Sequence, residues 1–219
     1  MRSNSEIRQN ALLIMKGNWG IGIAITLLLA VIVFTLSLLG AVIRWTADDP
    51  ILTGRIIERI ISIITTIFII YPITLSMAML FLNFVRDREQ LSVEGLFSGF
   101  SAQYYGKAIG LYLLTYIFTY LWTLLLIVPG IIKGLSYSLA PYILADNPEL
   151  SAIQAINESM KMMKGHKMDL FLMMLGAIGL SIASIVLLCL PLLWIIPYYQ
   201  TVMAAFYENV KQNYSQEAC

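Results

Sequence analysis

Charged residues are scarce in this chain. Of its 219 residues, 12% are Asp, Glu, Lys or Arg, about half the share of an ordinary soluble domain. Hydrophobic residues make up 59%, against roughly 45–50% in such a domain. The chain has one histidine, and its two cysteines, Cys189 and Cys219, fit neither a zinc site nor a CxxC redox pair. This composition excludes a soluble globule, a secreted disulfide scaffold and a disordered chain.

Motifs of catalysis are missing as well. The sequence contains no nucleophile elbow, phosphate loop, HExxH motif or pair of catalytic carboxylates. Its apolar segments hold no relay of carboxylates or histidines of the kind that proton-coupled pumps use. No basic stripe interleaved with aromatic residues occurs, so we expect no nucleic-acid partner. We therefore expect a protein that is not an enzyme and that holds neither a cofactor nor a metal ion.

Long apolar segments dominate what is present. Segments 17–43, 60–85, 108–132 and 170–207 each contain at least 25 residues and no charged side chain. A bilayer core of ~30 Å is crossed by ~20 apolar residues of helix, so each segment is long enough to span, and the last is nearly long enough to span twice. The chain is therefore predicted to be a single integral membrane domain over residues 1–219 that crosses the membrane several times.

Six transmembrane helices are predicted, at about 20–43, 60–85, 106–127, 131–146, 168–190 and 195–213. Pro129 and Gly130 predict a tight reversal between the third and the fourth, because proline lacks a backbone donor and glycine favours turns. Pro191 and Pro197 divide the last apolar segment in the same way.

The basic residues support this number of spans. Ten lysines and arginines fall on the side of the two termini and four on the other side, Arg44, Arg55, Arg59 and Lys133. Short loops rich in lysine and arginine stay in the cytoplasm, so both termini are expected there. A single kinked span in place of the third and fourth helices would destroy this asymmetry.

The six helices resemble three hairpins, with candidate repeats at 3–87, 91–146 and 147–213. Each has a short amphipathic helix, a basic junction with glycine, a long span, a proline and a second span. The second spans end at polar residues, Arg86–Asp87, Asp146 and Glu208. The predicted fold is thus all-α: six transmembrane helices as three hairpins, each preceded by a short amphipathic cytoplasmic helix. Convergence on a generic membrane hairpin is the alternative to true repetition.

Two of the amphipathic helices have clear sequence signals. Ser3 and Glu6 have the spacing of a capping box, ahead of an apolar face formed by Ile7, Ala11, Ile14 and Met15. In the third, Asn147 is suited to cap the helix and Pro148 to its first turn. Its expected apolar face is Leu150, Ile153, Ile156, Met160 and Met163.

A basic cluster follows this third helix and is the nearest approach to a binding site. It consists of Lys161, Lys164, His166 and Lys167, at the entry to the fifth span. Such residues either set the orientation of the chain or bind the headgroups of anionic lipids, and both readings stay open.

A stripe of hydroxyl-bearing side chains runs along the third span. It is formed by Tyr112, Thr115, Tyr116, Thr119, Tyr120 and Thr123. In lipid these hydroxyls need partners, so the stripe predicts either hydrogen bonds between helices or a pathway for a polar or amphiphilic molecule. Lys133, close to the predicted reversal, is expected to extend to the outer interface, with a substrate contact as the alternative.

Several of these segments together resemble a known family. They are Trp122, the run from Ile127 through Pro129 and Gly130 to Lys133, Tyr137 to Tyr142, Asp146-Asn147-Pro148 and Ser159 to Lys167, with Pro197-Tyr198 and Phe206 to Glu208 at the C-terminal end. The family is an uncharacterised group of bacterial integral membrane proteins, domain of unknown function 975. The resemblance covers essentially the whole chain, and it implies a bacterial plasma membrane but no activity, substrate or catalytic residue.

Two functional hypotheses follow. The first is a non-enzymatic multi-pass protein of the plasma membrane that organises or senses lipid, anionic lipid among it, or a protein partner at the cytoplasmic leaflet. A second copy of the chain is one such partner. The second hypothesis is a small permease-like transporter of an amphiphilic molecule, which would use the hydroxyl stripe.

Overall fold

The computed structural model describes residues 3–47, 49, 52–87, 90–186 and 190–217. The described residues form helices joined by short connections, which confirms the all-α class. In chain order these are α1 (Asn4–Met15), α2 (Trp19–Thr46), α3 (Thr53–Thr65), α4 (Tyr71–Asp87), α5 (Tyr105–Leu125), α6 (Ile127–Tyr137), α7 (Ala140–Asp146), α8 (Ala152–Met162), α9 (Lys167–Val186) and α10 (Leu192–Glu217). A π-helical turn, η1 (Thr66–Ile70), joins α3 to α4, and a 3-10 helix, η2 (Glu94–Phe100), precedes α5.

Five helical stretches of the described residues are long and apolar enough to cross a membrane. They are Trp19–Thr46, Thr53–Asp87, Tyr105–Leu125, Ile127–Asp146 and Lys167–Ile185. By length and composition the chain is therefore a multi-pass membrane protein. The sixth span expected from the sequence, α10, is 26 residues long but is not apolar enough to join this set.

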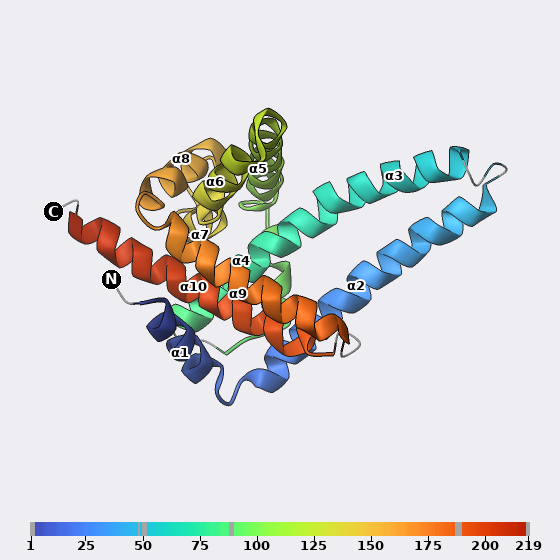
Figure 1. Ribbon diagram of the computed structural model, residues 1–219. Coiled ribbons are helices and arrows are strands. Elements are labelled where there is room, and N and C mark those ends of the chain that lie inside the picture. The colour runs from blue at the N-terminus through green and yellow to red at the C-terminus, as the bar shows by residue number, and fades with distance from the viewer. Residues whose placement is uncertain (1–2, 48, 50–51, 88–89, 187–189, 218–219) are drawn as a thin grey trace.

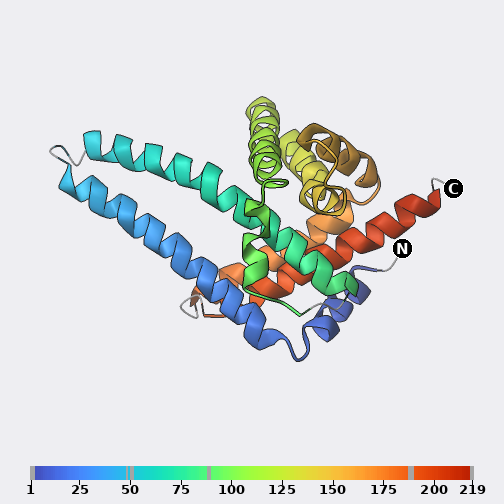
Figure 2. The ribbon, with the colours of Figure 1, turned by 180° about the vertical axis from the view of Figure 1, so that it is seen from behind.

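The helices are arranged around α10, with one hairpin extending away from the rest. Figures 1 and 2 show α2 and α3 as a long antiparallel arm, and α3 continues through η1 into α4. The N- and C-terminal ends lie close together on the side opposite the tip of this arm. A short helix comes before the first long helix of each hairpin: α1 before α2, η2 before α5 and α8 before α9.

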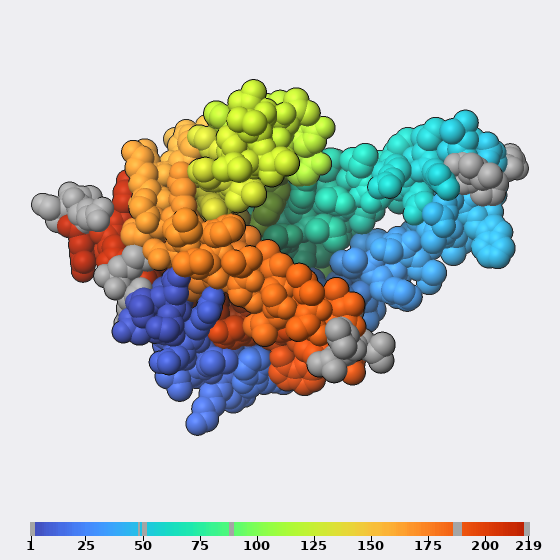
Figure 3. Space-filling model, viewed as in Figure 1, coloured from blue at the N-terminus to red at the C-terminus, as the bar shows by residue number. Residues whose placement is uncertain are grey.

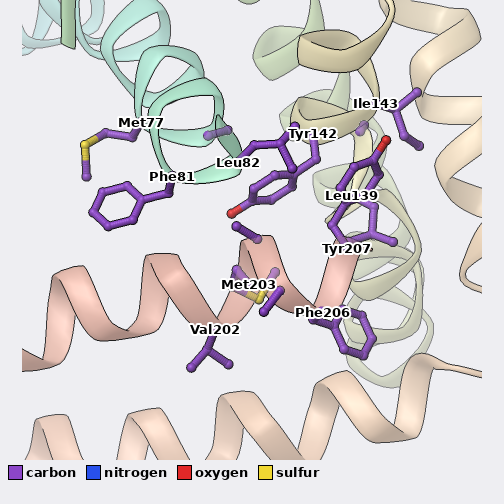
Figure 4. Packing of buried hydrophobic residues seen from close by; sticks show 14 of the residues in the cluster. Met77, Phe81, Leu82, Leu139, Tyr142, Ile143, Val202, Met203, Phe206 and Tyr207 are labelled. Carbon is purple, nitrogen blue, oxygen red and sulfur yellow. The ribbon is translucent and has the colours of Figure 1, made fainter. Parts of the chain in front are cut away.

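The core lies where α4, α7 and α10 meet. Figure 4 shows buried side chains from these helices close together, among them Phe81, Tyr142 and Met203. Phe81 and Phe206 are completely buried. The core therefore forms between the second helices of the three hairpins, which are far apart in the sequence.

The long helix from α3 to α4 continues through Pro72 because the freed backbone group finds another partner. Proline lacks the N–H that would bond the carbonyl four residues earlier, at Phe68. That carbonyl accepts a hydrogen bond from the Tyr105 hydroxyl at 3.2 Å. The π-helical turn η1 ends two residues before the proline, where such local adjustments are expected.

The reversal between the third and fourth predicted helices lies at a different residue from the expected one. Leu126 is the single extended residue between α5 and α6, with φ −158° and ψ 140°. Pro129 lies in the first turn of α6, where a missing N–H breaks no intrahelical bond. Gly130 is where α6 touches α5, since a Cβ there would lie 2.8 Å from Cα of Thr123. The proline–glycine pair thus starts a helix and brings two helices together, and the prediction that it forms the turn is wrong.

The start of the third amphipathic helix also differs from the prediction. Ser151 is the N-cap of α8 and forms a reciprocal capping box with Gln154. This box satisfies two orphan N–H groups, so the helix starts after Ser151, and Asn147 instead ends α7. By contrast, the box of Ser3 and Glu6 is confirmed. The expected buried face of α1 is confirmed as well, namely Ile7, Ala11, Ile14 and Met15.

Candidate functional site

Charged side chains from the ends of two helices and from the C-terminal half of a third meet on the side of the molecule where both termini lie. Arg86 comes from the last turn of α4, Asp146 from the end of α7, and Glu208 and Lys211 from α10. The guanidinium of Arg86 lies 2.6 Å from Asp146 and 2.5 Å from Glu208. The ammonium group of Lys211 lies 2.6 Å from the other oxygen of Asp146. We call these four residues the charge cluster.

Asp146 is the centre of the charge cluster. Its side chain is only 5% exposed, and its carboxylate accepts from Arg86, Lys211 and the Tyr207 hydroxyl. Burying a carboxylate is costly unless it is paired and hydrogen-bonded, and here both conditions are met. Two cations and two carboxylates balance, so the charge cluster joins α4, α7 and α10 without a net charge.

A polar cavity of about 380 Å³ lies beside the charge cluster, between α1, α4 and α10. Arg86 and Glu208 form part of its wall, together with Asn10 of α1 and Gln212 of α10. On another side of the charge cluster, Tyr142 stacks on Tyr207 with ring centroids 5.6 Å apart. These contacts hold the end of α7 against α10.

The sequence contained one signal for the charge cluster that was not used to find it. Arg86, Asp146 and Glu208 are the polar ends of the second spans in the three candidate repeats. If the three hairpins pack around one axis, the equivalent ends of their second spans lie close together. The opposite charges of Arg86, Asp146 and Glu208 at these ends therefore indicate a network of ion pairs. Lys211, one turn beyond Glu208, carries no signal that sets it apart from an ordinary basic flank.

The predicted basic cluster is found at the junction of α8 and α9, with unequal exposure and pairing. The Lys161 side chain is 59% exposed and lies 2.9 Å from Glu158. His166 Nδ1 lies 3.9 Å from Asp169. Lys164 is exposed, Lys167 is half-buried, and neither forms an ion pair with another described residue. Only two of the four are thus uncompensated.

The pairing of Lys161 affects both partners. The hydrogen bond from Lys161 lowers the pKa of the Glu158 carboxyl below its usual value. The same bond raises the pKa of Lys161. Such an exposed pair contributes little to stability, but it removes Lys161 from the charges free to attract an anion.

The hydroxyl stripe does not form one continuous face towards the bundle. Tyr116 and Tyr120 stack on each other and are 63% and 57% exposed. Tyr112 instead stacks on Tyr71, with centroids 5.3 Å apart. Thr119 and Thr123 face α6 and line a cavity of about 400 Å³ between α5, α6 and α9. That cavity is otherwise largely apolar, and the Thr123 hydroxyl bonds to its own helix at the Thr119 carbonyl. Thr115, on the same helix, is half-buried.

Comparison with known families identifies the chain. The family described as protein of unknown function (DUF975) matches residues 1–133 and 123–214, which together cover nearly the whole length. The chain belongs to DUF975. No curated protein matches it significantly, and neither does any solved structure.

The residues that carried the resemblance to DUF975 have structural roles here. Lys133 places its ammonium group 4.9 Å from the ring centre of Trp122, which joins α6 to α5. Asp146 is the centre of the charge cluster, and the Pro148 carbonyl accepts a bond from Lys107. The Ser159 hydroxyl donates to the Ser136 carbonyl at 2.7 Å and accepts from the Leu139 N–H at 3.2 Å. Ser159 thus satisfies backbone groups freed where α6 gives way to α7.

Within the described residues, no group of His, Cys, Asp and Glu side chains has the arrangement of a metal site. Cys189 and Cys219 lie outside the described residues. The candidate site is therefore a polar end of the molecule with a balanced charge cluster inside and two uncompensated lysines on its surface.

Proposed function

We propose that this DUF975 chain is a non-enzymatic protein of the bacterial plasma membrane that holds anionic lipid at the cytoplasmic leaflet. In this proposal α10 is the sixth span, and both termini are cytoplasmic. A helix of 26 residues is about 39 Å long, at about 1.5 Å per residue, which exceeds the ~30 Å core. Because α10 is surrounded by protein over residues 201–210, it can cross without being as apolar as a lipid-facing helix.

The observation that carries the proposal is the junction of α8 and α9. Lys164 and Lys167 flank Gly165, whose φ of +82° turns the chain sharply between the two helices. Directly after them, the apolar side chains of Met168 and Leu172 are 65% and 51% exposed. Cations at the edge of an exposed apolar surface occupy the level at which lipid phosphates lie.

Electrostatics indicates how strong this attraction is. Each uncompensated lysine near an anionic leaflet contributes about 1 kcal/mol. Lys161 and His166 have carboxylates nearby, so the attraction depends mainly on Lys164 and Lys167.

The test is to change Lys164 and Lys167 together to glutamine and to measure anionic lipid that is retained on purification, by mass spectrometry. Two charges at about 1 kcal/mol each correspond to a decrease on the order of tenfold or more in retention. High salt should reproduce this decrease in the wild-type protein, because screening shortens the range of exposed charges.

The matched control is Arg55→Gln with Arg59→Gln, which removes two cations from α3, on the arm at the other side of the molecule. This control should keep its anionic lipid. Unchanged retention in a correctly oriented Lys164→Gln, Lys167→Gln variant would contradict the proposal and leave the lysines as orientation signals only.

A permease-like transporter of an amphiphile is the second candidate. The cavity between α5, α6 and α9 favours it, because Thr119, Thr123 and Ser138 add hydroxyls to a largely apolar wall. A cysteine at Thr119 that reacts with a water-soluble thiol reagent, and is protected by an added amphiphile, would support this candidate. Absence of labelling would count against it.

A further inference from the structure

A second cavity, of about 270 Å³, lies between α1, α9 and α10. Arg8 of α1 lines it together with Gly176 of α9 and Tyr198 and Tyr199 of α10. The remaining wall is apolar and includes Met173, Leu180 and Ile195. In Figure 3, α1 lies against α9, and α10 reaches the surface between them.

Arg8 is a cation without a counter-ion at this place. Within the described part of the chain, its guanidinium forms no ion pair, and Nη2 donates a hydrogen bond to the Leu172 carbonyl at 3.3 Å. Asp169 lies one turn before Leu172 on α9, but its carboxylate lies 3.9 Å from His166 and forms no ion pair with Arg8. An arginine stays charged at all physiological pH values and carries five N–H donors. The cavity therefore presents an unbalanced positive charge and unused donors.

The hydroxyl of Tyr199 is a second, independent observation that points to a ligand. It is fully buried and has no hydrogen-bond partner among the described residues. Buried hydroxyls are rarely left unpaired, because desolvation without a bond is costly. The Arg8 charge lies within electrostatic range of both the Tyr198 and Tyr199 hydroxyls. Arg8 and Tyr199 thus line one cavity, and each has hydrogen-bonding capacity that the described residues do not use.

Position along α9 indicates the class of ligand. Leu172 and Gly176 lie five and nine residues beyond Lys167, or about 8 and 14 Å at about 1.5 Å per residue. A headgroup layer is about 5–8 Å thick on each side of the bilayer. With Lys167 at the membrane surface, Arg8 lies near the boundary between headgroups and acyl chains, where an uncompensated charge is a functional candidate.

We infer that this cavity binds the phosphate of an anionic phospholipid, with Arg8 and Tyr199 as the donors and the apolar wall against an acyl chain. The guanidinium fork matches two phosphate oxygens. This inference rests on the proposed orientation of the chain, but it names a site distinct from Lys164 and Lys167 of the α8–α9 junction.

Gly176 supplies the space that Arg8 occupies. A Cβ on Gly176 would lie 2.9 Å from Nη2 of Arg8, whereas a Cβ on Gly179 would have no neighbour within 4 Å. Alanine at position 176 would therefore push the guanidinium aside, and alanine at position 179 would not. The two glycines on one helix form a matched pair for the test.

The experiment uses the full chain, purified, delipidated and titrated with short-chain phosphatidylglycerol, with binding read by native mass spectrometry. Arg8→Gln and Tyr199→Phe should each weaken binding, the former by about tenfold or more, since a bond to a charged group is lost. Gly176→Ala should weaken it as well. Lys16→Gln, which removes a cation at the end of the same helix, and Gly179→Ala should bind as wild type does.

The outcomes of this experiment test the site, the class of ligand and the proposed function separately. Wild-type affinity in Arg8→Gln or in Tyr199→Phe, each shown to be monodisperse, would overturn the site. Binding of decanoate in place of phosphatidylglycerol would overturn the phospholipid assignment, and equal binding of phosphatidylcholine would overturn the need for net negative charge. Loss of binding in the Arg8 variant but not in the variant of Lys164 and Lys167 would support the cavity while contradicting the function proposed for these two lysines.

Discussion

The first and second helices of the three hairpins differ in what surrounds them. In α2, α5 and α9, which come first, 17%, 11% and 17% of the most apolar stretch is buried within the protein. In the stretch Ile127–Asp146, which holds α6 and α7, the buried share is 50%. In the stretch Thr53–Asp87, which holds α3 and α4, it is 28%. The first helices are thus apolar and exposed, whereas α4, α7 and α10 supply much of the core.

This difference shows that the apolarity of a helix in a membrane protein depends on whether the helix faces lipid or other helices. Lipid tails are as apolar as leucine, so a helix that faces lipid must be apolar on that side. A helix surrounded by other helices is free to carry polar groups that bond to its neighbours. α10, the most central helix, is therefore less apolar than the other long helices among the described residues. Its polar residues Glu208 and Lys211 lie in the charge cluster.

The strongest way to test this contrast is to break the charge cluster. Asp146→Asn should lower the free energy of unfolding by about 3 kcal/mol, the low end of the 3–5 kcal/mol expected for a broken buried ion pair. The low end applies because Arg86 and Lys211 are partly exposed, at 33% and 42%. Thermal unfolding in detergent measures the effect.

Asp87→Asn is the control for the charge cluster, because Asp87 is an exposed carboxylate on the same side of the molecule. Its change should have almost no effect. Equal stability of Asp146→Asn and the wild type would show that the three hairpins are held together by apolar packing alone.

A smaller effect should separate one phenylalanine on a second helix from one on a first helix. Phe206 of α10 is completely buried, whereas Phe34 of α2 is 67% exposed. Phe206→Ala should cost about 2 kcal/mol, less than the 3–5 kcal/mol of soluble cores, because the lost contacts are partly replaced by lipid on unfolding. Phe34→Ala should remain within about 0.5 kcal/mol of the wild type. Equal losses in unfolding midpoint would remove the distinction between inner and outer helices.

The smallest effect is expected where a first and a second helix touch. Gly130→Ala forces α6 away from Thr123, at about 1–3 kcal/mol for overpacking, offset by about 1 kcal/mol of helix propensity. A net loss of about 1 kcal/mol is expected. Gly134→Ala, one turn later, meets Thr119 at an ordinary 3.6 Å and should be neutral or slightly stabilising. Identical unfolding midpoints for the two variants would show that α5 and α6 separate without strain.

Local signals in the sequence succeeded where one signal had no competitor. Ser3 and Glu6 are the clear capping box at the N-terminus, and both the start of α1 and its buried face follow from them. For α8, Asn147 and Ser151 are both good cap residues, and the reciprocal bonds with Gln154 decide for Ser151. The buried face of α8 also differs in part from the prediction: Ile156 is buried as expected, but Ile153 is 53% exposed.

The break between α5 and α6 was missed for a related reason. Proline and glycine at 129–130 are typical of a turn, yet proline is equally suited to the first turn of a helix and glycine to close contact between helices. Sequence alone does not choose between these roles. The role of Gly130 is decided by its close contact with Thr123, which belongs to the preceding helix.

The sequence by itself determined the class of the protein, because apolar length and the scarcity of charge depend only on composition along the chain. It also determined the family and the helical start at Ser3. The tertiary structure alone decided which helices are inside, which charges are paired and which are left over. Arg86 is paired with carboxylates and Arg8 is not, and this difference depends on which helices meet in space. The polar ends of the second spans single out Arg86, Asp146 and Glu208 in the sequence, but only the packing of helices far apart along the chain decides which side chains pair.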